Sequence, residues 1–125
     1  MKAIKIDPVK QELTEVEIDG TLESIYEKLD CEVFTCPIAL DNMDTLYVDD
    51  EGLFVDEYKG AFYFGDYSQP LFGNGLLIGA NIEGESESVA SSIKTIEKKV
   101  KFLPEETGKY LLSQFQNSGY TFIPL

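Results

Sequence analysis

An aromatic segment between residues 58 and 75 holds the side chains best suited to binding chemistry. Its six rings are interspersed with glycine and proline, which favour loops, so some of the rings should reach the surface. A tyrosine ring is apolar with a polar end, and it can stack on a planar ligand or contact a protein. The other interpretation is that the rings close one end of a sheet. The predicted binding residues are Tyr58, Phe62, Tyr63, Tyr67, Phe72 and the turn Gly73, Asn74 and Gly75.

Negative charge is the second feature with binding chemistry. The chain has 23 acidic residues against 10 lysines, a formal net charge of −13, and no arginine, histidine or tryptophan. This excess of charge repels nucleic acid, and without arginine there is no bidentate fork for phosphate. It favours instead a basic site on a protein. The acids predicted to form this surface are Glu15, Glu17, Asp49, Asp50 and Glu51.

The missing residue types narrow the chemistry further. Without histidine, the common Ser-His and Cys-His nucleophile pairs cannot form, and an enzyme would have to use Asp, Glu, Tyr or Lys. The run Asp49-Asp50-Glu51-Gly52 lacks the alternating ligand spacing of a calcium loop, so we interpret it as a solvated turn. We therefore predict that the protein is not an enzyme and needs no metal or cofactor.

The two cysteines, Cys31 and Cys36, are predicted to be free, buried thiols. On an extended segment they would lie about 16 Å apart. A disulfide joins Cα atoms that lie about 4.4–6.8 Å apart. A zinc site would need further ligands, and the chain has no histidine and no third cysteine.

A central strand within residues 73–84 must position these side chains. Apolar residues occupy both parities of this run, which is typical of a strand covered on both faces. Gly79 adds no side chain to the core, so we expect another backbone or a helix to approach it closely. The spacing of Gly73, Gly75 and Gly79 is similar to that of a phosphate-binding loop, but such a loop opens a helix and here a strand follows.

The spacing of apolar residues also predicts the other elements of the first half. A helix should start at Asp19-Gly20-Thr21 and carry an apolar stripe of Leu22, Ile25, Tyr26 and Leu29. Pro37 indicates that the strand around it ends there or lies at an edge. The predicted strands are residues 2–7, 13–18, 31–38, 45–48 and 53–55, the last two flanking a tight turn.

Two helices are predicted after a polar connector at residues 85–92. The first has one apolar face made of Ile93, Ile96, Val100 and Leu103. It also carries the basic cluster of Lys94, Lys98, Lys99 and Lys101. The second starts at Pro104, buries Leu111, Leu112 and Phe115, and stops at residues 117–119, before a last strand at residues 120–123.

These elements predict a single α+β domain over residues 1–125. We expect an antiparallel or mixed sheet with helices packed on one side, a core of about residues 1–85 and a helical C-terminal extension of about residues 86–125. No apolar run approaches the roughly 20 residues of a membrane helix. Asp7-Pro8 interrupts the start of the chain before a secretory segment develops, so we expect a cytoplasmic protein without membrane contact.

Three motifs resemble a family of small phage- and plasmid-borne domains of unknown function. They are Ile18-Asp19-Gly20-Thr21-Leu22-Glu23, Tyr47-Val48-Asp49-Asp50-Glu51-Gly52-Leu53 and the run from Gly73 to Gly84. The resemblance covers about residues 1–85. It implies an α+β fold on a mobile genetic element and carries over no catalytic residue.

The expected function is non-enzymatic binding. In one version the acidic surface engages a basic site on a host protein or on another copy of the chain, as in nucleic-acid mimicry or counter-defence. In the other version the aromatic segment and the glycine turn form a pocket that sequesters a small nucleotide-like ligand. An enzyme that works without histidine and arginine is the third alternative, and the sequence leaves the oligomeric state open.

Overall fold

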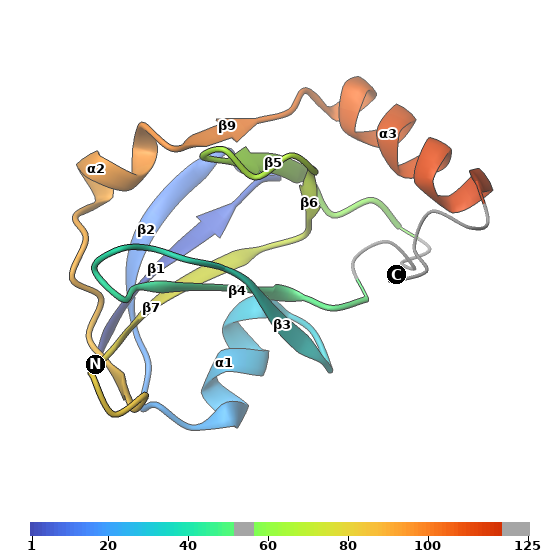
Figure 1. The fold of residues 1–125 in the computed structure, drawn as a ribbon. Coiled ribbons are helices and arrows are strands. Elements are labelled where there is room, and N and C mark those ends of the chain that lie inside the picture. The colour runs from blue at the N-terminus through green and yellow to red at the C-terminus, as the bar shows by residue number, and fades with distance from the viewer. Residues whose placement is uncertain (52–56, 119–125) are drawn as a thin grey trace.

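The computed structural model describes residues 1–51 and 57–118 (Figure 1). The strands predicted at residues 53–55 and 120–123 lie outside them. The described strands are β1 (Lys2–Asp7), β2 (Glu12–Glu17), β3 (Phe34–Ala39), β4 (Thr45–Asp49), β5 (Ala61–Phe64), β6 (Leu71–Phe72), β7 (Gly75–Ala80), β8 (Ser86–Glu87) and β9 (Val100–Phe102). The described helices are α1 (Leu22–Leu29), α2 (Ile93–Glu97) and α3 (Glu105–Ser118).

β7 is the central strand, as predicted. The larger sheet has the order β2-β1-β7-β4-β3, with β8 paired to the end of β7, and all its pairings are antiparallel. Leu76, Leu77 and Ile78 are at most 1% exposed, so β7 is covered on both faces. The predicted hairpin of β1 and β2 is confirmed, and β3 lies at the sheet edge, where Pro37 costs no ladder hydrogen bond on its outer side.

Different elements pack on the two faces of the larger sheet. α1 packs on one face, where the buried residues are Ala3, Ile18, Ile25, Leu29, Leu76 and Ile78. A smaller antiparallel sheet, β6-β5-β9, and α2 cover the other face, where Ile4, Ile6, Leu46, Phe62, Phe64, Leu77 and Ile96 are among the buried residues. α3 follows β9, and its Leu112 belongs to one buried cluster with Ala61 of β5, Phe72 of β6 and Leu103. The α+β class is therefore confirmed, whereas a packing of all helices on one side is not.

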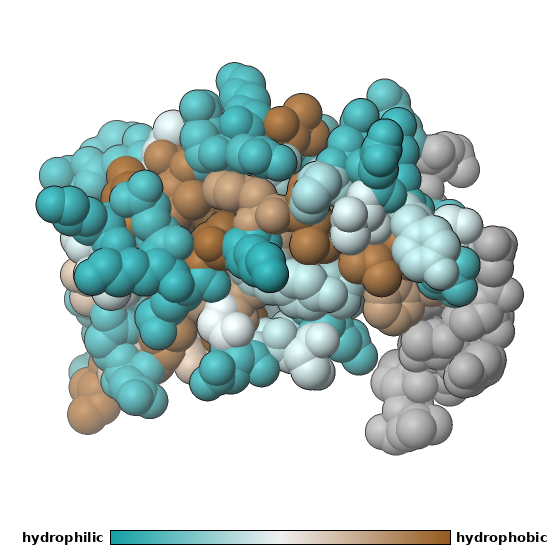
Figure 2. All heavy atoms as spheres, turned by 90° about the horizontal axis from the view of Figure 1, so that it is seen from above, coloured by the Kyte–Doolittle hydropathy of each residue, from teal (hydrophilic) through white to brown (hydrophobic). Residues whose placement is uncertain are grey.

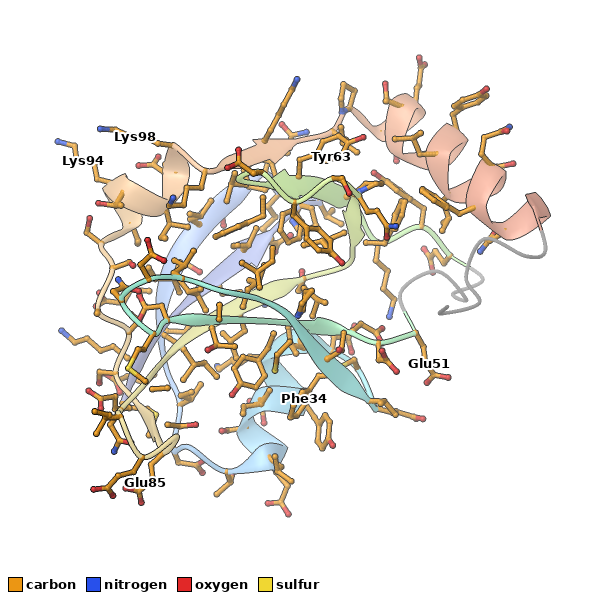
Figure 3. The ribbon with its side chains drawn as sticks, in the orientation of Figure 1. Phe34, Glu51, Tyr63, Glu85, Lys94 and Lys98 are labelled. Atoms are coloured by element: carbon orange, nitrogen blue, oxygen red, sulfur yellow. The ribbon has the colours of Figure 1, made fainter. Side chains whose placement is uncertain are left out.

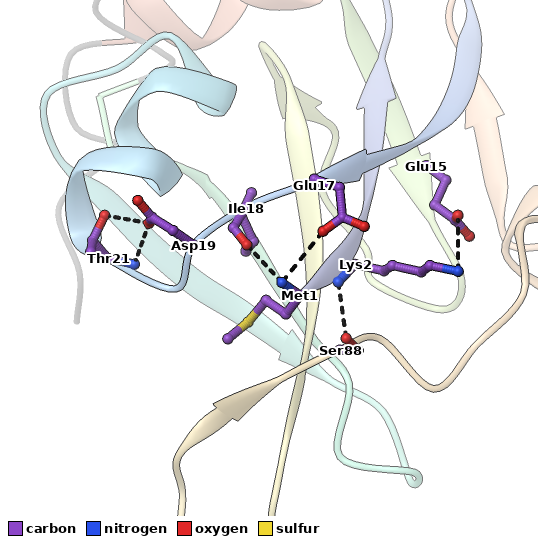
Figure 4. Close-up of polar contacts among 8 residues, drawn as sticks. All are labelled: Met1, Lys2, Glu15, Glu17, Ile18, Asp19, Thr21 and Ser88. Atoms are coloured by element: carbon purple, nitrogen blue, oxygen red, sulfur yellow. Dashed lines mark hydrogen bonds and ion pairs between the residues drawn. The ribbon is translucent and has the colours of Figure 1, made fainter.

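α1 begins where the motif Asp19-Gly20-Thr21 predicted. Thr21 is the N-cap, and its Oγ1 accepts a hydrogen bond of 3.2 Å from the N–H of Ser24. The Oδ1 atom of Asp19 in turn accepts from the N–H and the hydroxyl of Thr21, at 2.9 and 2.6 Å (Figure 4). Leu22 is 59% exposed and does not belong to the buried stripe of α1, whose buried residues are Ile25 and Leu29.

These bonds make the start of α1 sensitive to acid. The hydroxyl of Thr21, followed by its N–H, lowers the pKa of Asp19 to about 2, below the ordinary value of 3.8. A lowered pKa stabilises the fold above the unfolded-state value, and that contribution is lost as the pH falls from about 4 to about 2. We expect Asp19→Asn to be less stable than the natural chain at pH 7 and equally stable near pH 2. Chemical unfolding across this range measures the difference, and a gap that stays constant with pH would contradict it.

Gly79 lies where another backbone crosses β7, as predicted. A Cβ at this position would meet the carbonyl oxygen of Ser88, and it would lie 3.0 Å from that of Glu87. Ser88 and Val89 bond to Lys2 at the start of β1, through Ser88 Oγ and the Val89 N–H (Figure 4). The chain after β8 can therefore cross the larger sheet only because residue 79 has no side chain.

Asp44 attaches the segment after β8, which crosses β7, to the loop between β3 and β4. It is completely buried, and its two oxygens accept from the N–H groups of Ala90 and Ser91 at 2.9 and 2.8 Å. The Nδ2 group of Asn42 adds a longer contact of 3.4 Å. A carboxylate that accepts several N–H bonds is satisfied without a cation. Asp44 thus joins segments that are 46 residues apart in the sequence.

Two predictions of local structure are wrong. The helix predicted over residues 93–103 ends at Glu97, and Val100 belongs to β9, because β9 completes the smaller sheet by pairing with β5. Lys94 and Lys98 point away from the body of the molecule (Figure 3). Both cysteines are free, but Cys36 is exposed because it lies on the edge strand β3, and Cys31, between α1 and β3, is only half-buried.

Candidate functional site

The structure distributes the aromatic segment between the core and the surface. Phe62 and Phe72 are 0% and 6% exposed, and Gly73 and Gly75 are also buried. A Cβ on Gly75 would lie 3.0 Å from the Phe62 ring, so this glycine allows close packing below β5. These four predicted binding residues have little or no surface left for a ligand.

The remaining predicted aromatic residues do not form one surface. Tyr63 is half-buried on β5 and packs, like Tyr58, against the cluster of Ala61, Phe72, Leu103 and Leu112 below α3. Tyr67 lies in the loop after β5 and is 36% exposed. Of the predicted binding residues, only Tyr58 and Asn74 line a concave site that the described residues form.

That site is a groove of about 700 Å³ between five chain segments. Its walls are the turn between β1 and β2, the end of α1, the segment before β5, the start of β7 and the junction of β9 with α3. We term it the acidic groove, because four carboxylates and two lysines line it. The charged and polar lining residues are Asp7, Lys10, Gln11, Asp30, Glu57, Tyr58, Lys59, Asn74 and Glu105.

The carboxylates of the acidic groove are only partly neutralised. Asp7 Oδ1 accepts bonds of 3.1 Å from the N–H groups of Val9 and Lys10, which shapes the turn between β1 and β2. Asp30 pairs with Lys59 at 3.4 Å, and Glu105 pairs with Lys109 at 3.6 Å on the outside of α3. Exposed pairs of this kind are screened by water and contribute little. The groove therefore keeps a net negative charge that suits a cationic ligand.

Tyr58 separates the acidic groove from a second cavity of about 420 Å³ along α3, and both are also lined by Glu57 and Glu105. Burial raises the pKa of the Tyr58 phenol, and the nearby Glu105 carboxylate adds to the rise. The hydroxyl is buried and has no hydrogen-bond partner within the described residues. The ring is thus a neutral wall, and an aromatic face beside carboxylates can hold an ammonium or guanidinium group.

α3 can approach Tyr58 because residue 108 is glycine. A Cβ there would overlap the Tyr58 hydroxyl and would also lie 2.5 Å from the ring carbon that carries it. Gly→Ala inside a helix ordinarily stabilises by about 1 kcal/mol. Here we expect Gly108→Ala to destabilise by about 1–3 kcal/mol, because the side chain forces α3 away from the sheet.

Chemical denaturation of a double-mutant cycle tests this contact. In a Tyr58→Ala background the obstruction is gone, and Gly108→Ala should then be neutral or stabilising. An equal cost of Gly108→Ala in both backgrounds would show that α3 does not rest on Tyr58.

The predicted acidic residues lie toward opposite edges of the larger sheet. Glu15 and Glu17 are on the edge strand β2, where they contact the Lys2 Nζ atom at 3.7 Å and the Met1 amino group at 3.5 Å (Figure 4). Asp49 is the last residue of β4, next to the other edge strand, Asp50 and Glu51 follow it, and Glu51 points outward (Figure 3). The structure does not bring these two groups together.

The acids after β4 lie close to the end of α1. Burial raises the pKa of Cys31 to about 11, and the charges of Asp49 and Asp30 contribute to the rise. Asp30 also lines the acidic groove, so negative charge extends from the groove toward the end of β4. Sequence reasoning missed Asp7, Asp30, Glu57 and Glu105, because nothing in their local sequence indicates that these separate segments meet.

The acids do not converge on a point. Within residues 1–51 and 57–118, no three Cys, Asp or Glu side chains come together as a metal site requires. The face above β9 and α3 is mostly hydrophilic in the space-filling view, with apolar side chains visible between the polar ones (Figure 2). None of the helices in the described part has the length and apolarity to cross a membrane.

Comparison with known proteins gives a family but no established activity. A family model described as a domain of unknown function, DUF3846, matches residues 1–101, which run from the start of β1 into β9. No curated protein and no solved structure matches the chain. The match spans both sheets, α1, α2 and most of the acidic groove, and leaves α3 outside. The chain belongs to the DUF3846 family of domains of unknown function.

Proposed function

We propose that this chain is a non-enzymatic binding protein whose acidic groove receives a lysine or arginine side chain of a partner protein. The observation that carries the proposal is the lining of the groove, with four carboxylates around the Tyr58 ring. A cation entering the groove gains attraction from the carboxylates and from the aromatic face. Lys10 and Lys59 reduce this attraction without reversing its sign.

The same lining ranks a basic protein above a small nucleotide-like ligand. A phosphate needs N–H donors and positive charge, and arginine is absent from the chain. Tyr58 and Asn74 could stack on and hydrogen-bond to a base, so the nucleotide remains the second candidate. The groove carboxylates would repel its phosphates.

We propose further that the partner is a host protein. The resemblance to small phage- and plasmid-borne domains makes a host protein with a basic, nucleic-acid-binding site the first partner to seek. An acidic protein that occupies such a site would act as an accessory or counter-defence factor by imitating nucleic acid. Steering by charge would make its association fast and dependent on salt.

Titration with a short peptide of serine and lysine tests the groove directly. We expect binding at low ionic strength that weakens as salt rises, because exposed charges are screened within about 10 Å at 0.1 M. Glu57→Lys with Glu105→Lys should weaken it about tenfold or more, since two attractions become repulsions inside the groove. The matched control reverses two exposed acids on β8 and the turn before it, Glu83→Lys with Glu87→Lys, and should change affinity much less.

Recovery of partners from a bacterial lysate at low and high salt would extend the test to natural proteins, beside thermal-shift screening with nucleotides. A nucleotide that stabilises the protein at both salt levels, with no protein partner recovered, would replace the basic protein as the ligand. We also expect no hydrolase, transferase or nuclease turnover with or without divalent ions. Turnover abolished by a single Asp or Glu substitution would contradict the binding function.

A further inference from the structure

The outer surface of α1 and the start of β3 presents apolar side chains that the described residues leave uncovered. Leu22 is 59% exposed and Val33 is 44% exposed. Leu22 and Tyr26 are one turn apart on α1, so their side chains are neighbours. The half-buried Tyr26 ring lies against Phe34, with the centroids 5.2 Å apart. We term Leu22, Tyr26, Val33 and Phe34 the α1 strip.

The α1 strip has a firm base. Phe34 also contacts Tyr47 on β4 edge to face, with centroids 5.1 Å apart, and both rings pack against the buried cluster below α1 (Figure 3). The carbonyl oxygen of Val33 accepts a bond of 2.9 Å from the N–H of Asp50, which holds the start of β3 to the end of β4. A rigid aromatic centre with exposed apolar neighbours is typical of the residues that dominate protein interfaces.

The surroundings of the α1 strip are negatively charged. Between residues 19 and 32 there are five acidic residues and one lysine, Lys28. Glu23, Glu27, Asp30 and Glu32 in this range are exposed. Asp50 adds a further exposed carboxylate beside Val33. An apolar centre with a charged rim is the ordinary composition of a protein interface, and this rim is complementary to lysine and arginine.

Strand addition at this edge is disfavoured. Pro37 lies inside β3 and has no N–H to donate, and the pairing of β3 with β4 shifts register between Thr35 and Ile38. Prolines and bulges on edge strands prevent other strands from pairing with them. A partner would therefore contact the side chains of the α1 strip rather than extend the sheet.

We propose that the α1 strip is a docking surface for a segment of a partner protein that presents an apolar side chain flanked by lysine or arginine. The apolar side chain would lie on Leu22, Tyr26 and Val33, and its basic neighbours would face the carboxylates of α1 and Asp50. This surface follows the length of α1, whereas the acidic groove lies beyond its end at Asp30. The inference rests on exposed apolar side chains and does not require the groove to bind.

Fluorescence anisotropy with three labelled peptides of one length tests the docking surface. One peptide has a helical pattern of leucine and lysine, the second has serine in place of leucine, and the third has glutamate in place of lysine. The leucine and lysine peptide should bind tightest, and the glutamate peptide should not bind. Leu22→Ser with Val33→Ser should weaken the leucine and lysine peptide about tenfold and leave the serine and lysine peptide unchanged.

Control variants distinguish binding at the α1 strip from binding elsewhere on the protein. Ile82 is 90% exposed on the turn between β7 and β8, and Ile82→Ser should leave the binding of both lysine peptides unchanged. Glu57→Lys with Glu105→Lys should weaken the serine and lysine peptide, which binds at the acidic groove, and should change the binding of the leucine and lysine peptide much less. If the serine and lysine peptide is unaffected by this variant, the groove is refuted and the α1 strip is not. The docking surface is refuted if the Leu22 and Val33 variant binds the leucine and lysine peptide normally. It is also refuted if this variant alone loses a self-association seen by sedimentation, since a second copy would then cover the strip.

Discussion

Ile78→Asp is expected to cost at least about 4 kcal/mol, most of the stability of a domain of this size. Ile78 is 1% exposed in the middle of β7 and faces the cluster below α1. The substitution removes a large apolar side chain from that cluster and puts a carboxylate there. Burying a charge without a partner is among the most costly single changes in a protein.

Glu51→Lys is the matched surface change for this experiment. It also alters a charge, but residue 51 is exposed in the turn after β4, where substitutions usually change stability by less than about 0.5 kcal/mol. Chemical denaturation of both variants against the natural chain gives the comparison. Similar losses for the two would mean that β7 is not the centre of the fold.

Asp44→Ala is expected to cost about 2–4 kcal/mol, because it removes the acceptor of two backbone N–H groups at once. Ala90 and Ser91 would lose their bonds to the carboxylate, and the chain that carries α2 would lose its attachment to the loop between β3 and β4. Asp44→Asn keeps one acceptor oxygen and should fall between the alanine variant and the natural chain. The same loop offers a control in the exposed Asp41, whose change to alanine should have little effect.

Hydrogen exchange gives this prediction a local measurement. The amides of residues 90 and 91 should exchange faster in Asp44→Ala. The exchange rate of amides in the middle of β7 should change only as much as the free energy of global unfolding changes. If Asp41→Ala destabilises as much as Asp44→Ala, the buried carboxylate is not the attachment. The experiment also bears on function, because the chain fixed by Asp44 leads to β9 and to the wall of the acidic groove.

The elements formed by neighbouring residues could be predicted from the sequence. The apolar residues on both parities of residues 76–80 identified the central strand, and the missing side chain of Gly79 indicated a close crossing, which Ser88 makes. Asp19 and Thr21 marked the start of α1 because an N-cap depends on residues three positions apart. Pro37 predicted that the strand around it would end there or lie at an edge, and β3 lies at the edge.

The smaller sheet could not be predicted, because its strands have two to four residues and pair across long separations. Phe62 lies opposite Phe102, and the apolar spacing near residue 100 fits a helix as well as a strand. Residues 100–102 form a strand because they pair with β5. The aromatic segment was ambiguous for the same reason, since rings suit both a core and a surface.

The sequence by itself therefore determined the charge, the absence of histidine and arginine, the central strand and the helix starts, all of which depend on composition or on residues near one another. The tertiary structure alone decided that Asp44 is a buried attachment rather than a solvated acid, since its partners are 46 and 47 residues away. It also decided that Asp7, Asp30, Glu57 and Glu105 share one groove, while Glu15 lies on the edge strand β2 and Asp49 lies on β4 toward the other edge. The physical reason is that a site assembled from distant segments depends on how the sheets and α3 pack, and local spacing carries no information about that packing.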